Sequence, residues 1–121
     1  MNGLVVLGVA ALGGLGALAR FGLDSAIQAR RLGEFPLGTF VVNISGSLAL
    51  GVLVGAGVKD DAFLLTGTAA LGSFTTFSTW VFEAQRLAQD GEWRVAGANL
   101  GLSLAAGLAA AAVGRTLGGL L

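Results

Sequence analysis

The sequence predicts an all-α membrane protein in which four helices cross the bilayer. Hydrophobic residues make up 55% of the 121 residues and charged residues only 12%, about half of the roughly 25% found in globular domains. The mean hydropathy is +0.83. Uncharged residues form four blocks, 2–19, 35–58, 62–82 and 95–114, each close to the roughly 20 residues that a spanning helix needs. A soluble helical fold would need a polar face for water, which these blocks lack.

The four transmembrane helices are predicted at about residues 3–24, 37–57, 62–88 and 93–117, so that residues 1–121 form a single transmembrane domain. Pro36 suits the start of the second helix because its missing N–H costs nothing there. We therefore expect a multi-pass protein of the cell (inner or plasma) membrane, with the lipid bilayer as its surroundings.

Small or polar residues recur at a spacing of four along one face of two predicted helices. Small residues let helix backbones approach closely in lipid. Packing alone does not require Asn43 or Asn99. The Asn43 amide could nevertheless bridge two helices, and the Thr39 hydroxyl could bond to its own helix backbone. The two stripes are Thr39, Asn43, Ser47, Gly51 and Gly55 in the second helix, and Asn99, Ser103, Gly107 and Ala111 in the fourth.

The third predicted helix contains a polar run at a depth where polar groups are costly. Residues 71–80 read Leu-Gly-Ser-Phe-Thr-Thr-Phe-Ser-Thr-Trp. Hydroxyl groups inside a bilayer must face protein, water or a permeating solute. Phe74, Phe77 and Trp80 recur every third residue, which is also a pattern of ordinary core packing. This run is where we expect the function to reside.

The available chemistry argues against an enzyme. The chain has no His and no Cys, and Asp24 and Glu83 are expected in water at helix ends. We also expect no nucleic-acid partner. A small dual-topology multidrug exporter is the alternative, but that class depends on a Glu in its first helix, and none is present here. The remaining groups are neutral donors and aromatic ring edges, which can replace part of the hydration shell of an anion.

The positive charges give only a weak orientation signal. Arg20 could pair with Asp24 four residues later, or could raise the anion concentration at a pore mouth. A weak bias permits insertion both ways round and therefore an antiparallel dimer. With four spans, Lys59 and Arg115 lie on one side, and Arg30, Arg31, Arg86 and Arg94 lie on the other.

Three segments together carry a resemblance to a known family. Residues 13–20 form a glycine-rich helix that ends in Arg20, and residues 38–47 follow the pattern G-T-x-x-x-N-x-x-G-S. Residues 72–80 are similar to G-x-x-T-T-F-S-T-F, with Trp80 in place of the last Phe. In this order they resemble the Fluc (CrcB-type) fluoride channels over essentially the whole chain.

The resemblance implies a passive, highly selective fluoride channel that exports fluoride from the cytoplasm and confers fluoride resistance. It implies a dual-topology antiparallel homodimer with two pores, and a third helix broken near residues 72–76. A central structural Na⁺ would be held by the backbone carbonyls of Gly72 and Thr75 from both subunits.

The resemblance also assigns roles to side chains. Asn43 would donate to fluoride, while Phe77 and Trp80 would present ring edges to it. Trp80 stands where the family usually has Phe; its indole offers C–H edges and also a true N–H donor. Asn99 stands where some members have an aromatic residue. The remaining pore hydroxyls would be Thr39, Ser78 and Ser103, with Arg20 in the vestibule.

Overall fold

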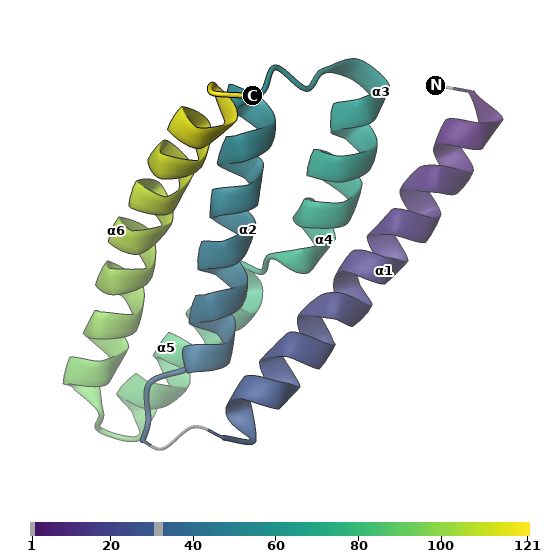
Figure 1. Ribbon diagram of the computed structural model, residues 1–121. Helices are drawn as coiled ribbons and strands as arrows, with labels where there is room; N and C mark the ends of the chain where they lie inside the picture. The colour runs from purple at the N-terminus through teal and green to yellow at the C-terminus, as the bar shows by residue number, and fades with distance from the viewer. Residues whose placement is uncertain (1, 31–32) are drawn as a thin grey trace.

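The computed structural model describes residues 2–30 and 33–121, and it confirms the all-helical fold with a broken third helix (Figure 1). Within these described residues, three unbroken helices, α1, α2 and α6, are each long and apolar enough to cross a membrane. The third pass is divided among α3, the π-helix η1, α4 and α5. The bounds are α1 Gly3–Gln28, α2 Leu37–Gly55, α3 Asp60–Phe63, η1 Leu64–Leu71, α4 Gly72–Phe74, α5 Ser78–Gln89 and α6 Trp93–Gly118.

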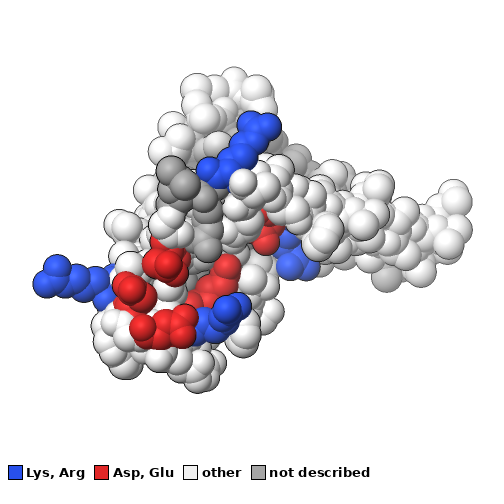
Figure 2. Space-filling view, turned by 90° about the horizontal axis from the view of Figure 1, so that it is seen from below, with Lys and Arg blue, Asp and Glu red and all other residues white. Residues whose placement is uncertain are grey.

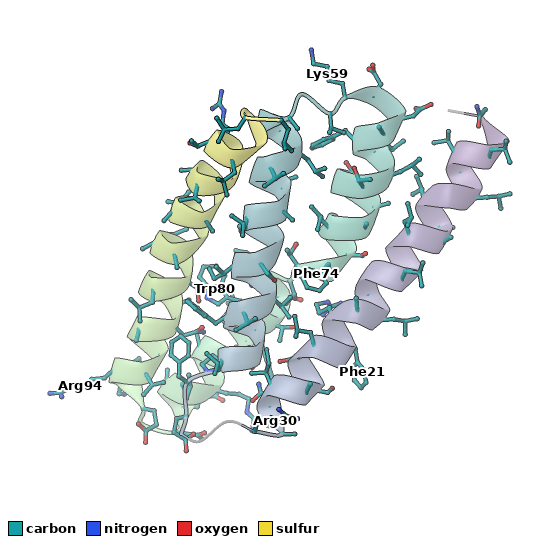
Figure 3. All side chains as sticks on the ribbon, viewed as in Figure 1. Phe21, Arg30, Lys59, Phe74, Trp80 and Arg94 are labelled. Atoms are coloured by element: carbon teal, nitrogen blue, oxygen red, sulfur yellow. The ribbon has the colours of Figure 1, made fainter. Side chains whose placement is uncertain are left out.

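The four passes place alternate connections at opposite ends of the bundle. Figure 1 shows the two chain ends and the turn after α2 at one end, and the turns after α1 and α5 at the other. Lys59 therefore lies at one end while Arg30 and Arg94 lie at the other (Figure 3). Viewed along the bundle, the second end carries a concentration of acidic and basic side chains (Figure 2). Lys59, Arg30 and Arg94 thus lie at the ends of the bundle, as a bilayer favours.

Helices α2 and α6 run parallel and pack through glycine. A Cβ atom added at Gly51 would meet the Ala111 carbonyl, and one added at Gly114 would meet the Leu48 carbonyl. Gly118 lies in the same way against Val52. Each contact joins a backbone directly to a backbone, which is how helices associate in lipid without a hydrophobic driving force.

Helix α1 is attached to the bundle along a narrow strip. Gly16 is buried against the Ala70 carbonyl and the Ser73 hydroxyl, so only a glycine fits there. The opposite face is apolar and exposed, with Leu15, Leu18 and Phe21 at 59%, 68% and 72% exposure. An exposed face of this kind is stable in lipid, which agrees with a multi-pass membrane protein.

The third pass breaks at residues 75–77, slightly later than the expected break near residues 72–76. Thr75 adopts an extended conformation (φ −83°, ψ 162°), and helix α5 begins at Ser78. The expected position was too early because the Thr75 N–H still donates to the Leu71 carbonyl at 3.0 Å. The helical ladder therefore runs through Phe74 before it stops.

Two acidic residues lie deeper than predicted. Helix α1 continues to Gln28, so Asp24 lies inside the helix and not at its end. Its carboxylate packs against Gly38 at the start of α2, and its Oδ1 atom is buried. Glu83 lies within α5 and is half-buried. The expectation that both carboxylates are simply solvated at helix ends was wrong.

Candidate functional site

The helix break is held open by an amide from the neighbouring helix. The side chain of Asn43 on α2 donates from Nδ2 to the Thr76 carbonyl at 2.8 Å. The Thr76 N–H in turn donates to Asn43 Oδ1, also at 2.8 Å. This reciprocal pair satisfies two backbone groups that the break releases at membrane depth, where unsatisfied groups are costly. The bridging role considered for Asn43 is therefore real, and its Nδ2 retains a second N–H.

The carbonyls of Gly72 and Thr75 are among those that lose their helical partners at the break. In a continuous helix the Thr76 N–H would bond to the Gly72 carbonyl, but it is directed to Asn43. The Thr79 N–H would bond to the Thr75 carbonyl, but it donates to the Thr76 hydroxyl at 3.2 Å. The carbonyls of Gly72 and Thr75 are thus released from the ladder, and both residues line one groove.

Arg20 binds the end of the first half of the broken helix. Its Nε–H donates to the Ser73 carbonyl at 3.2 Å, in the last turn before the break. A cation at a helix C-terminus is favourable because the carbonyls there carry partial negative charge. Within residues 2–30 and 33–121, Arg20 does not form the ion pair with Asp24 that the i, i+4 spacing suggested.

An uncharged groove of about 420 Å³ runs past the break between α2, α6 and the third pass. Four of the six residues predicted to line the fluoride pore also line this groove, together with the two residues whose carbonyls were predicted to bind Na⁺. No Lys, Arg, Asp or Glu is among its lining residues. The predicted residues that line it are Asn43, Gly72, Thr75, Phe77, Trp80 and Ser103.

Two aromatic rings stand edge to face at this groove. The centroids of Phe77 and Trp80 are 5.5 Å apart with an interplanar angle of 74°. Phe77 is 73% exposed, which is not the environment of a core packing residue. Figure 3 shows Trp80 between the ribbons of α6 and α2. Both rings line the groove, whereas Phe74, third in the sequence stripe, is not among the lining residues.

Thr39 and Arg20 line a separate cavity of about 130 Å³ on the α1 side of the break. The Thr39 side chain is 1% exposed, and its hydroxyl has no hydrogen-bond partner in the described part of the chain. It does not bond back to its helix as considered above. Thr76 lines both this cavity and the groove. Ser78 is exposed and lines neither of them.

Sequence reasoning missed the central role of Thr76. Its N–H, carbonyl and hydroxyl each make one of the bonds that define the break. Asn99 was singled out as a member of a stripe and as a position where some members have an aromatic residue, but its pairing was not predicted; it is completely buried and bonded to Trp80. The available signal was the same for both residues: a polar side chain at membrane depth requires a partner.

The fold and this uncharged site define a small multi-pass membrane protein of the transport class. A family model described as "CrcB-like protein, Camphor Resistance (CrcB)" matches residues 7–115. The chain belongs to this family.

Named relatives agree with this assignment. A "Fluoride-specific ion channel FluC 2" of Mycolicibacterium paratuberculosis is 48% identical over 113 residues, covering 93% of this chain and 93% of the relative. A protein of the same name from Symbiobacterium thermophilum is 48% identical over 115 residues, covering 91% of this chain and 94% of the relative. "Fluoride-specific ion channel FluC 1" of Leifsonia xyli is 44% identical, covering 99% and 90%. A family of channels is not a family of enzymes, as expected.

Proposed function

We propose that this protein is a passive, selective fluoride channel that exports fluoride from the cytoplasm and so protects the cell against it. The observation that carries the proposal is the uncharged groove at the helix break, which brings Asn43, Phe77 and Trp80 together. The names of the relatives support the same ion.

The groove offers the interactions that a conducted anion needs. Asn43 has one amide N–H left after its bond to Thr76, and the rings of Phe77 and Trp80 carry positive edges. None of these groups carries a full charge. Binding is therefore strong enough to replace part of the hydration shell and weak enough for release, which is the balance that conduction requires.

A second copy of the chain completes the pore. The groove is open along one side, and Phe77 at its edge is 73% exposed. A permeating anion cannot be left against lipid, so another protein surface must close this side. We propose an antiparallel homodimer, because the weak charge bias permits both orientations. Two-fold symmetry then gives two equivalent pores.

The carbonyls of Gly72 and Thr75 fit a central structural Na⁺. Both have lost their helical N–H partners, and neutral carbonyls of unwound helices are suitable Na⁺ ligands. Among the described residues no group of three His, Cys, Asp or Glu side chains could hold a metal. When bound by both subunits, the ion would supply positive charge between the two helix breaks.

The remaining assigned residues take positions around the groove. Arg20 and Thr39 line the adjoining cavity, which would serve as the vestibule. The Arg20 guanidinium would raise the local anion concentration there. Ser103 lines the groove itself. Ser78 is exposed in the single chain and joins the pore only when the partner subunit covers it.

Ion efflux from liposomes tests the function. Vesicles containing the purified protein and potassium fluoride should release fluoride when a potassium ionophore relieves the membrane potential, and matched chloride vesicles should not. Vesicles that retain fluoride would refute the proposal. Fluoride release that occurs only under an imposed proton gradient would favour the coupled multidrug-type exporter over the channel.

A further inference from the structure

Asn99 is the most deeply buried polar side chain next to the groove, yet it is not one of the residues that line it. Its exposure is 0%, and it lies on α6 behind Trp80. A completely buried amide in a membrane protein must have all its bonds supplied by protein, and its partners indicate what it controls.

Asn99 on α6 and Trp80 on α5 are joined by two reciprocal hydrogen bonds. The indole Nε1–H of Trp80 donates to the Asn99 backbone carbonyl at 3.0 Å. The Asn99 side-chain Nδ2 donates back to the Trp80 carbonyl at 3.1 Å. These two bonds fix both the position of the α5 backbone and the rotation of the indole ring.

The orientation of the indole decides what the groove offers to an anion. With its N–H bonded to the Asn99 carbonyl on α6, the indole has no free N–H to offer to the groove that Trp80 lines beside Phe77. An indole N–H is a true hydrogen-bond donor that would bind chloride as well as fluoride. Keeping this donor away from the groove leaves weak, short-range edges that favour a small anion.

Asn99 also accepts a hydrogen bond from a neighbouring hydroxyl. The Ser103 Oγ donates to Asn99 Oδ1 at 3.4 Å, one turn further along α6. This long bond is weak. Asn99 thereby contacts two of the residues that line the groove: Trp80 through its backbone carbonyl and its side-chain Nδ2, and Ser103 through its Oδ1.

We propose that Asn99 is a positioning residue for anion selectivity, acting through Trp80. This inference rests on the proposed fluoride conduction. Asn99 does not contact the ion; it holds the indole N–H of Trp80 out of the anion path.

Selectivity measurements in a double-mutant cycle test the proposal. The ratio of fluoride to chloride efflux should fall about tenfold in Asn99→Leu, which keeps the branching and the number of side-chain heavy atoms. This change removes the Nδ2–H bond to the Trp80 carbonyl, so that the α5 backbone no longer holds the indole N–H against the Asn99 carbonyl. In the Trp80→Phe background the same change should alter the ratio by less than about twofold, because no indole N–H remains to be released. Thr116→Val is the control on the same helix, since that exposed hydroxyl bonds only to its own helix backbone. An equal fall in both backgrounds would overturn the proposal.

Hydrogen exchange of the indole N–H gives a readout that does not depend on ion flux or on an Asn99 variant. The chain has two Trp residues, so ¹⁵N spectra of the wild type and of Trp93→Phe assign both signals. The Trp80 N–H should exchange at least about tenfold more slowly than that of Trp93, which is 71% exposed. Equal exchange would refute the positioning role even in a conducting channel. Slow exchange in a protein that conducts no fluoride would refute the proposed function while leaving the indole anchored.

Discussion

At the scale of single residues, the helix break depends on the side chain of Asn43. Its replacement by Leu would remove both bonds to Thr76 and leave that N–H and carbonyl without partners inside the membrane. We expect Asn43→Leu to lower the unfolding free energy by about 2 kcal/mol or more and to abolish most fluoride flux. Denaturation in detergent and liposome efflux would measure the two effects.

The matched control for Asn43 is Ser45→Ala on the same helix. Ser45 is exposed, and its hydroxyl bonds only to the Val42 carbonyl of its own helix. Its removal should change stability by no more than about 0.5 kcal/mol. If Asn43→Leu were as harmless as this control, the break would be an intrinsic property of residues 75–77 and would not be imposed by α2.

Substitution of Phe77 distinguishes a role in conduction from a role in packing. Because its ring is 73% exposed in the single subunit, Phe77→Ala creates no cavity in the fold and should leave the subunit stable. We expect most of the fluoride flux to be lost while size-exclusion chromatography still shows a dimer. A variant that retains flux but elutes as a monomer would identify Phe77 as an interface residue instead.

Thr75 tests whether the proposed Na⁺ ligand is a backbone carbonyl or a side chain. The Thr75 hydroxyl already bonds to the Leu71 carbonyl at 3.1 Å, so the group released by the break is the Thr75 carbonyl. Thr75→Ala keeps that carbonyl, and the dependence of flux on Na⁺ should change only mildly. Complete loss of Na⁺ dependence would show that the hydroxyl is the ligand.

At the scale of helices, glycine contacts fix how α2 and α6 pack. A Cβ at Gly114 would collide with the Leu48 carbonyl, a backbone atom that cannot move aside, whereas one at Gly101 on the same helix meets nothing within 4 Å. Gly114→Ala should therefore destabilise the fold by about 1–3 kcal/mol through overpacking. Gly101→Ala should be neutral or stabilising, because Ala is the better helix former. Thermal unfolding of the two variants distinguishes them, and equal melting temperatures would contradict the packing.

The sequence predicts the transmembrane passes and their number well, because the length of each uncharged block is a local property of the sequence. That length can be compared directly with the thickness of a bilayer. It places the break less well, since the break is set by Asn43, 33 residues away in the chain. The π-helix η1 and the pairing of Trp80 with Asn99 were not predicted for the same reason. Hydroxyls in residues 71–80 indicate that partners are needed at this depth, but only the packed helices determine which N–H meets which carbonyl.

At the scale of the whole molecule, the balance of charge between the two ends determines how the chain inserts. Lys59 lies at the end that carries the chain termini, while Arg30 and Arg94 lie at the other end, and the net charge is zero. A small excess of Lys and Arg at one end gives a weak topological preference, so both orientations should be populated. An antiparallel dimer can form only under that condition.

Cysteine labelling of intact cells measures this distribution directly. The chain contains no Cys, so Lys59→Cys introduces a single thiol at one end of the bundle. About half of the molecules should react with a membrane-impermeant maleimide added outside, because an antiparallel dimer exposes one copy of this turn on each side. Detergent-solubilised protein should react completely, which controls for access to the thiol. In Arg94→Cys, whose thiol lies at the opposite end, about half of the molecules should also be labelled from outside. Complete labelling of one variant and none of the other would mean a single orientation, and the proposed antiparallel dimer would have to be abandoned.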